Sequence, residues 1–239
     1  MILYIVRHGH PDYATDTLTD TGKMQAELVG KRLFEEGIDV IYSSPMGRAI
    51  ETAEPACEMM GIRKHIEEWA HEIDDERLTT FPDGKLKPIG ILQNTSFLED
   101  GNFAYSYDDT FKCPPLKSAN MQAAVEYIEE NGKDFLERLG YKEENGSYRI
   151  LRENNQKVAL FCHAAFLKTW LSVLLKVPLH VMWSSFEHSP FTAVTVIEFK
   201  NNPDGFTAPR CIKISDVSHL PDELVGILHT QFNPKPEQE

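Results

Sequence analysis

The chain has 239 residues, of which 41% are hydrophobic and 26% charged, and its formal net charge is −13. Its length is enough for one domain with a substantial core, or for two smaller domains. The acidic balance argues against nucleic acid and anionic membranes as partners, because the chain has no surplus of basic side chains to neutralise phosphates. A small anionic substrate would therefore need a local cluster of Arg and His.

Cysteine spacing and hydropathy bear on the cellular compartment. The four cysteines (Cys57, Cys113, Cys162 and Cys211) are far apart in the sequence, and no two of them form a C-x-x-C pair. Such spacing predicts reduced side chains rather than a disulfide framework or a zinc site. The apolar run before Arg7 is too short for a signal peptide, and no later run reaches transmembrane length. We therefore expect a cytoplasmic protein.

The N-terminal part predicts a strand followed by a helix. Residues 2–6 form a continuous apolar run rich in β-branched side chains, which is typical of a strand buried on both faces. After the loop "HGHPDYATDT", the segment "LTDTGKMQAELVGKRLFEEG" carries apolar residues near helical spacing. Thr19, Asp20 or Thr21 can cap the start of this helix, and Gly37 can end it.

A second strand and helix follow. The run "DVIYSS" predicts a strand, and "SPMGRAIETAEPACEMMG" predicts a helix with Ser44 as its N-cap, Pro45 at its first position and Gly61 at its end. Pro55 should kink or interrupt this helix, because proline lacks a backbone N–H. The next segment, "IRKHI", is expected to form a third strand.

The middle of the chain has the weakest pattern, with several prolines and aromatic residues between about residues 69 and 119. We interpret about residues 69–150 as a cap or insertion packed over one end of the core. Within it, "MQAAVEYIEENGKDFLERLG" predicts a helix in spite of Gly132, and "GSYRILRENNQ" predicts a small hairpin or connector.

The C-terminal part returns to regular patterns. The run "KVALFCH" predicts another buried strand, and "AAFLKTWLSVLLKV" predicts a helix stopped by Pro178. The segments "FTAVTVIEFK" and "APRCIKISDV" flank "NNPDG", which is a strong hairpin signal. The tail "NPKPEQE" is expected to be frayed.

Strands alternate with helices through the first half of the chain and again near residue 160. This order predicts one α/β domain over residues 1–239, a three-layer α/β/α sandwich with a mostly parallel central sheet. Sites in such sheets lie at the carboxyl ends of the strands. Three places are therefore candidates: Arg7 and His8 after the first strand, residues 44–48 after the second, and His163 after the later strand.

The residues at these strand ends suit the binding of an oxyanion. Arg7 offers a planar fork of donors that fits a phosphate. Arg48 lies in the first turn of a predicted helix, so its charge and the free N–H groups of that helix can act on one anion. His163 stands at another helix start, and Gly9 lets the backbone turn so that the His8 ring can face the pocket.

An imidazole among two guanidiniums and a second imidazole suits phosphoryl transfer without a metal. His8 would attack phosphorus to form a phosphohistidine, which water then hydrolyses, while the basic groups stabilise the equatorial oxygens. A carboxylic acid near the pocket would give the leaving alkoxide its proton.

The motifs together resemble a known family. "RHG" after the first strand, "SSPMGRAIETAE" after the second and "FCHAAF" after a later one are similar to the histidine phosphatase superfamily, also called phosphoglycerate mutase-like. "LTDTGKMQA" and "ISDVSHL" resemble that family's first helix and last strand. The resemblance covers residues 1–67 and 157–220, and the middle matches loosely. It implies a phosphomonoesterase that acts on a small phosphorylated metabolite and needs no cofactor.

Site residues are implied position by position. His8 resembles the family's nucleophile, and Arg7, Arg48 and His163 resemble the rest of its phosphate pocket. These four residues are therefore expected to bind the phosphoryl group and to take part in catalysis.

The implied proton donor is a glutamate soon after the third strand, in an L-x-E setting. The segment "IEEW" places Glu68 two residues after Ile66, so we expect Glu68 to be the donor. Glu72 and Glu67 are the alternatives.

Three departures from the family pattern bear on the activity. His10 stands where the family commonly has Glu, Gln or Thr, so no catalytic role is carried over to it. Ala164 replaces a glycine that many members have after the second histidine. The mutases have an Asn after RHG and basic residues in the insertion, whereas this chain has "PDYATDT" and no adjacent basic pair between Asp74 and Lys133. These differences favour a phosphatase over a mutase, which is the alternative.

Two other classes of function are compatible with parts of the pattern. The H-x-H of His8 and His10 also begins some zinc-dependent barrels, but Arg7 would repel a dication and the chain lacks eight strand–helix units. A binding protein for phosphorylated ligands could use the same fold without catalysis. The sequence leaves the substrate, the roles of His10 and Tyr13, and the oligomeric state open, and a homodimer is one compatible assembly.

Overall fold

The computed structural model describes residues 1–73, 101, 104–118, 121–186 and 190–225. Within them, a six-stranded sheet has the order β11-β9-β1-β8-β4-β5. Its strands are β1 (Ile2–Arg7), β4 (Val40–Ser43), β5 (Lys64–Ile66), β8 (Lys157–Cys162), β9 (Val194–Glu198) and β11 (Arg210–Asp216). Strands β1, β8, β4 and β5 are parallel, while β9 is antiparallel to both β1 and β11. The expected mostly parallel sheet is confirmed.

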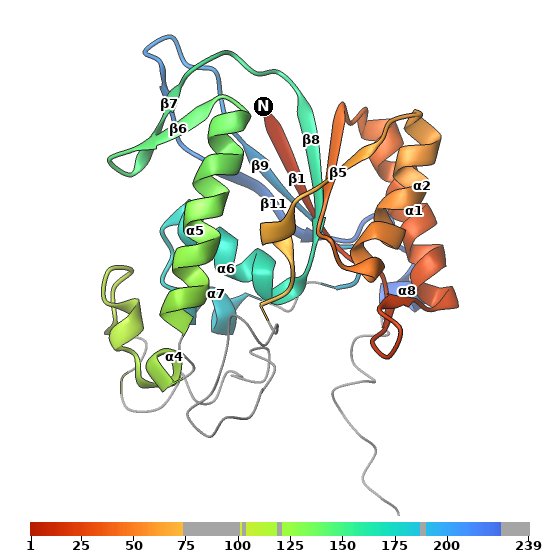
Figure 1. Ribbon diagram of the computed structural model, residues 1–239, viewed down its shortest axis with the longest axis horizontal. Helices are drawn as coiled ribbons and strands as arrows, with labels where there is room; N and C mark the ends of the chain where they lie inside the picture. Colours follow the sequence, from red (N-terminus) through yellow and green to blue (C-terminus); the bar gives the residue numbers. More distant parts are fainter. Residues whose placement is uncertain (74–100, 102–103, 119–120, 187–189, 226–239) are drawn as a thin grey trace, which may run out of the picture.

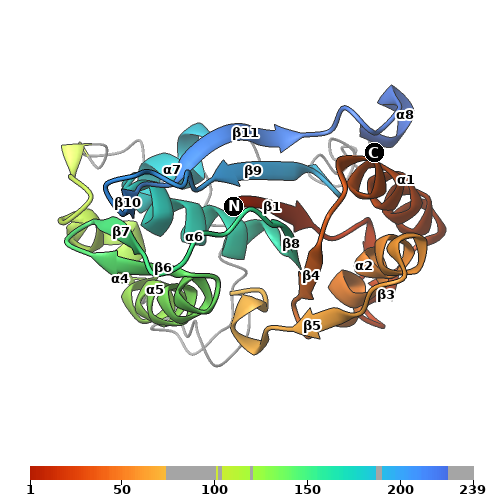
Figure 2. The same cartoon turned by 90° about the horizontal axis from the view of Figure 1, so that it is seen from above.

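Helices cover both faces of this sheet (Figures 1 and 2). One face carries α1 (Asp20–Glu36) and α2 (Gly47–Met60). The other face carries α5 (Met121–Arg138), α6 (Ala164–Leu175) and α7 (Leu179–Ser185). The shorter helices are η1 (Glu68–Ala70), η4 (Thr110–Lys112), α4 (Pro114–Ser118) and α8 (Asp222–Val225). The predicted three-layer α/β/α architecture is confirmed.

Strand β1 shows why its sequence is apolar throughout. Leu3 and Ile5 are buried in the cluster that packs against α5 and α6, whereas Tyr4 and Val6 are buried in the cluster under α1 and α2. Successive side chains of a strand point to opposite faces, so a strand covered on both sides needs apolar residues at every position.

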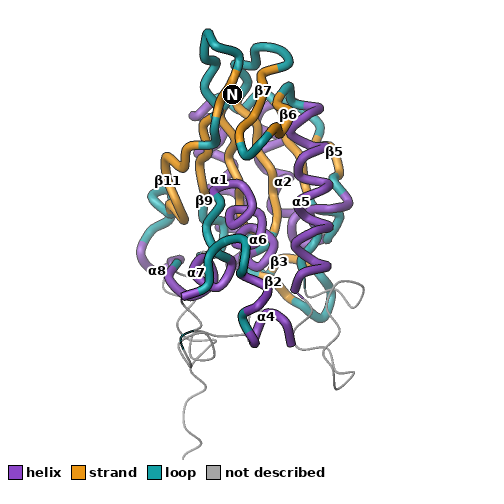
Figure 3. Tube along the Cα trace, turned by 90° about the vertical axis from the view of Figure 1, so that its left-hand side faces the viewer, coloured by secondary structure: helices purple, strands orange, loops and turns teal. Residues whose placement is uncertain are grey.

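Two small sheets flank the central one. The first has the order β10-β7-β6, from β6 (Tyr141–Glu144), β7 (Ser147–Ile150) and β10 (Phe206–Thr207). It lies near the amino end of β1, whereas α4 lies at the opposite end of the molecule (Figures 1 and 3). The second is the ribbon of β2 (Pro11–Asp12) and β3 (Thr17–Leu18), directly after β1.

The helix ends agree with the expectations for α1, and for α2 they agree at Gly61, which ends the helix, but not at its start. The Thr19 hydroxyl accepts from the Gly22 N–H and caps α1, and Gly37 ends this helix in a left-handed conformation. Helix α2 begins at Gly47 after Met46, so the expected N-cap at Ser44 is wrong. Pro55 was expected to kink or interrupt this helix, and it does not interrupt it, because α2 continues through Pro55 to Met60.

Gly132 lies inside α5 because Trp170 of α6 packs directly against it. A Cβ at this position would lie 2.6 Å from the Trp170 indole nitrogen. Glycine therefore sets the close approach of the two helices, at some cost in helix propensity.

Parts of two expectations lie outside the described residues, namely the middle of the proposed cap (residues 74–100) and the tail "NPKPEQE". Of the helices that are described, none has both the length and the apolar character needed to cross a bilayer.

A polar chain links the end of β11 to the residues before β9. The Arg32 guanidinium pairs with Asp216 at 2.7 Å and donates to His219 Nδ1 at 3.2 Å. Because arginine can only donate, a neutral His219 carries its proton on Nε2, which lies 3.2 Å from the Thr192 hydroxyl. That hydroxyl in turn donates to the Phe191 carbonyl. Thr192, at the end of these hydrogen bonds, has a left-handed conformation (φ 58°), which is unfavourable for a β-branched residue.

We expect Gly132→Ala to destabilise the fold by about 1–3 kcal/mol, because the added methyl group overpacks the contact with Trp170. In an open helical position the same change would stabilise by about 0.4–1 kcal/mol. Urea unfolding measures the difference, with the exposed Glu130→Ala in the same helix as the control. A Gly132→Ala variant as stable as the parent would contradict the close packing of α5 on α6.

We expect His219→Gln to flatten the pH dependence of stability. Burial, followed by the charge of Arg32, lowers the pKa of His219 from 6.5 to about 4. Between these values the unfolded chain binds the proton and the folded chain does not, so the free energy of unfolding falls as the pH falls from 6.5 toward 4. Urea unfolding at pH 7 and pH 5 should show a smaller loss in the variant, and equal losses would contradict the assignment.

Candidate active site

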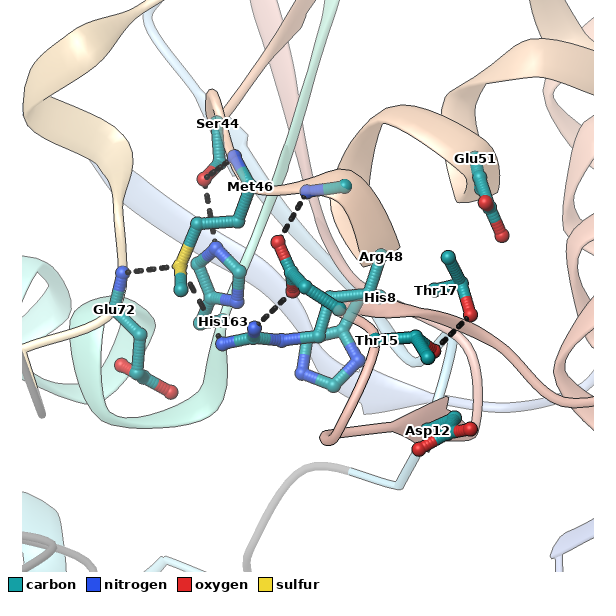
Figure 4. Close-up of polar contacts among 12 residues, drawn as sticks. His8, Asp12, Thr15, Thr17, Ser44, Met46, Arg48, Glu51, Glu72 and His163 are labelled. Carbon is teal, nitrogen blue, oxygen red and sulfur yellow. Dashed lines mark hydrogen bonds and ion pairs between the residues drawn. The ribbon is translucent and has the colours of Figure 1, made fainter.

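Parallel pairing brings three strand ends together. Arg7 is the register partner of Cys162, so His8 and His163 follow on adjacent strands. The His8 N–H donates to the Cys162 carbonyl at 2.9 Å, and the two imidazole rings lie 5.2 Å apart between centroids. Strand β4 pairs with the other edge of β8. Ser44 directly follows β4, and its N–H donates to the carbonyl of Phe161 in β8. The sheet thus assembles the expected histidines at its carboxyl edge (Figure 4).

His8 is held with one ring nitrogen available. Its Nδ1 lies 2.7 Å from the Gly9 carbonyl oxygen, which can only accept, so Nδ1 carries the proton. Burial, followed by the charges of Arg7 and Arg48, holds the pKa of His8 well below its usual value of 6.5. The ring is therefore neutral at pH 7, and its Nε2 has an unprotonated lone pair.

His163 is fixed by Ser44. The Ser44 hydroxyl lies 2.7 Å from His163 Nε2 and accepts from the Met46 N–H at 3.2 Å. The one hydroxyl proton can then go to Nε2, which leaves the ring proton on Nδ1. Among the described residues Nδ1 has no hydrogen-bond partner, although it is buried. Burial, followed by the charges of Arg48, His8 and Arg7, holds the pKa of His163 well below 6.5.

Two guanidiniums supply the positive charge of the site. Arg7 and Arg48 are both buried, at 7% and 6% exposure. The Arg7 guanidinium lies over the Phe191 ring, 4.3 Å from its centroid. Burial lowers the pKa of Arg7, an effect that Tyr13 and the carboxylate of Glu72 oppose. Both side chains are charged at neutral pH, since guanidinium does not lose its proton in proteins.

The three glutamates considered as proton donors lie in different places. Glu68, the expected donor, is exposed at the start of η1. Glu67 is buried, and both of its oxygens accept from Arg138, with the Trp69 indole donating to one of them. Glu72 is buried at 8% exposure and acts electrostatically on Arg7.

Glu72 is anchored at the start of α6, directly after His163. Its carboxylate accepts from the Phe166 N–H at 2.9 Å, and its own N–H faces the Met46 sulfur at 3.4 Å. Figure 4 shows Glu72 on the same side of the site as His163 and Met46. The geometry therefore brings Glu72 to the cluster and leaves Glu68 and Glu67 outside it.

His10 and Tyr13 line the edge of the site. His10 Nδ1 bonds the Thr19 hydroxyl at 2.9 Å, and its ring meets Phe191 edge-on at 5.1 Å. His8 and His10 are therefore oriented by different partners. No cluster of three or more potential metal-ligating side chains occurs in the described part of the chain. The exposed Tyr13 ring lies 5.5 Å from the Arg48 guanidinium carbon.

Sequence reasoning missed two residues that contact the cluster. Phe191 precedes β9, and it meets Arg7 because β9 runs antiparallel to β1 and starts beside the end of that strand. Asp16 pairs with the Arg48 guanidinium at 2.5 Å and accepts from the Gly47 N–H at 2.6 Å. The short spacing between "RHG" and the first helix is the signal that could have drawn attention to Asp16, because it keeps the loop close to α2.

The arrangement has the parts that phosphoryl transfer requires. An unprotonated imidazole nitrogen lies among two buried guanidiniums and a second imidazole, and a buried carboxyl group is close by. Such a set can position a phosphoryl group and balance the charge of its equatorial oxygens.

Comparisons with known proteins agree with this geometry. The model of the histidine phosphatase superfamily (branch 1) matches residues 3–81. The serine/threonine-protein phosphatase Pgam5 of Caenorhabditis elegans is 25% identical over 94% of this chain and 66% of its own length. The "Probable phosphoglycerate mutase GpmB" of Photorhabdus laumondii is 32% identical over 30% of this chain and 37% of its own length. The matches thus span roughly one to two thirds of these relatives.

Solved structures show the same fold. The phosphoserine phosphatase of Entamoeba histolytica, in complex with 3-phosphoglyceric acid, superimposes with a TM-score of 0.61 at 21% identity, covering 92% of this chain and 99% of that one. The alpha-ribazole phosphatase of Shigella flexneri gives a TM-score of 0.56 at 20% identity, with 90% and 97% coverage. The family model therefore matches residues 3–81 of this chain, and the solved structures show that the chain has the same fold as these phosphatases.

Proposed function

We propose that this protein is a metal-independent phosphomonoesterase that acts on a small phosphorylated metabolite through phospho-His8. One observation carries the proposal: the buried His8 has its Nδ1 against the Gly9 carbonyl, which leaves an unprotonated Nε2 in the pocket that contains Arg7, Arg48 and His163. A neutral imidazole in a positively charged pocket is a nucleophile for phosphorus rather than a ligand for a further cation.

The proposed reaction has two steps. His8 Nε2 attacks phosphorus and forms a P–N bond while the P–O bond of the ester breaks, and the leaving alkoxide takes a proton from a carboxylic acid. Water then attacks the phosphohistidine, loses a proton to the same carboxylate and releases inorganic phosphate, which restores His8. Arg7, Arg48 and His163 Nδ1–H stabilise the equatorial oxygens in both steps.

We assign the proton transfers to Glu72 instead of Glu68. The assignment is supported by the burial of Glu72, its position at the start of α6 beside His163 and its electrostatic effect on Arg7. An exposed Glu68 has none of these features. The Glu67 carboxylate already forms an ion pair with Arg138 and accepts a hydrogen bond from the Trp69 indole.

The departures of this sequence from the family pattern of the mutases favour hydrolysis over mutase activity. The chain has no adjacent basic pair between Asp74 and Lys133, in the insertion where the mutases carry basic residues. The relative with the longest match is named a phosphatase, and a structural neighbour is a phosphoserine phosphatase that binds 3-phosphoglyceric acid. These names support phosphatase activity.

We expect His8→Ala to lower kcat on an aryl phosphate by about three orders of magnitude or more, because the variant lacks the nucleophile. Wild-type activity should survive EDTA. Rapid quenching with ³²P-labelled substrate should trap an acid-labile, base-stable phosphoprotein in the wild type and none in the variant. His10→Ala is the matched control and should retain activity within about tenfold, because His10 only lines the edge. Loss of activity in EDTA, or a phosphoprotein in the variant, would contradict the mechanism.

We expect Glu72→Gln to lower kcat by about 10²–10⁴ on alkyl phosphates and much less on aryl phosphates, whose leaving groups need no acid. Glu68→Gln is the control and should change kcat by less than about twofold, because its carboxyl group is exposed away from the cluster. Steady-state kinetics on the two substrate classes measures the difference. The assignment fails if Glu68→Gln shows the leaving-group dependence and Glu72→Gln does not.

A further inference from the structure

The ribbon of β2 and β3 places a carboxylate on the cation that a phosphoryl group would use. Asp16 Oδ1 lies 2.5 Å from Arg48 Nη1, and Asp16 Oδ2 accepts from the Gly47 N–H at 2.6 Å. The second terminal nitrogen, Nη2, faces the Met46 sulfur at 3.4 Å. One internal carboxylate thus uses both the guanidinium and the first N–H of α2.

The local backbone is shaped for this contact. Asp16 has a left-handed conformation (φ 53°), which aspartate tolerates better than most residues do. A Cβ on Gly47 would lie 2.3 Å from the Asp16 carbonyl oxygen, so only glycine lets the ribbon approach α2 this closely. Tyr13, from the same turn, lies against the Arg48 guanidinium and opposes the lowering of the Arg7 pKa by burial.

The two members of the ion pair differ in exposure. The Arg48 side chain is 7% exposed, whereas the Asp16 side chain is 41% exposed. A buried guanidinium without an anionic partner is costly, because its lost hydration is not replaced. The carboxylate, by contrast, can return to water at little cost. Asp16 can therefore leave Arg48 when another anion takes its place, and it can return when that anion leaves.

We propose that Asp16 is an internal competitor for the phosphoryl site, which the phosphate of the substrate displaces from Arg48 and from the start of α2. This inference rests on the proposed function, since it concerns the same pocket. The Asp16 carboxylate places one oxygen on the Arg48 guanidinium and the other on the Gly47 N–H, as two oxygens of a phosphoryl group would. Its presence keeps Arg48 paired in the free protein and weakens the binding of inorganic phosphate, which favours product release.

The test is binding of inorganic phosphate to the full chain by isothermal titration calorimetry at constant ionic strength. Asp16→Asn removes the charge, while its amide oxygen can still accept from Gly47 and Asn tolerates the left-handed conformation. We expect the Kd for phosphate to fall by about tenfold in this variant, because no ion pair must be broken. The KM for a phosphomonoester should fall with it, without a rise in kcat.

Asp12→Asn is the matched control, since Asp12 belongs to the same ribbon and its carboxylate accepts from the Ala14 N–H. We expect this variant to change the phosphate Kd by less than about twofold. Equal tightening in both variants would show a long-range charge effect, and weaker binding in Asp16→Asn would show that Asp16 orients Arg48. Either result overturns the inference and leaves the phosphatase proposal standing. Failure of the wild type and of both variants to bind phosphate would overturn both proposals.

Discussion

The parallel pairing of β1 with β8 is the constraint on which the site depends. With Arg7 opposite Cys162, the next residue on each strand is a histidine, and both rings leave the sheet at the same edge. A shift of one residue in this register would turn alternate side chains to the other face and separate the rings. The register is fixed by the two cores, because Leu3 and Ile5 must face α5 and α6 while Tyr4 and Val6 face α1 and α2.

The same edge concentrates positive charge in a protein whose net charge is −13, and burial decides how that charge is carried. The guanidiniums of Arg7 and Arg48 stay charged, and their field together with desolvation keeps His8 and His163 neutral. In the proposed mechanism, positive charge and nucleophilicity are therefore carried by different residues. A pocket of four cations would bind phosphate tightly but contain no lone pair, whereas two neutral rings between two cations provide both.

Sequence reasoning identified the residues at the strand ends because hydrophobic runs and parallel topology locate those ends directly. It favoured Glu68 as the proton donor, whereas the structure leaves Glu68 exposed and buries Glu72, and the reason for this exposure is local. Strand β5 ends at Ile66, and the alternation of exposed and buried side chains continues into the 3₁₀ turn at residues 68–70, because Ile66 is exposed and Glu67 is buried. Trp69 then points inward and Glu68 outward, which an "I-x-E" pattern does not reveal. Ser44 was similarly placed as a helix cap, although its hydroxyl bonds His163, a partner 119 residues away.

Asp16 shows why a buried cation shapes the structure around it even before a ligand is present. Arg48 is mostly buried, so an anion within the free protein offsets its lost hydration, and the short ribbon after β1 supplies this anion from a residue that solvent can reach. Glu72 holds a comparable place near Arg7, but its carboxylate is fixed by the N–H groups of α6 and cannot leave as easily. The two carboxylates therefore suit opposite roles. The anchored one can move protons at a constant position, and the exposed one can yield its place to a phosphoryl group.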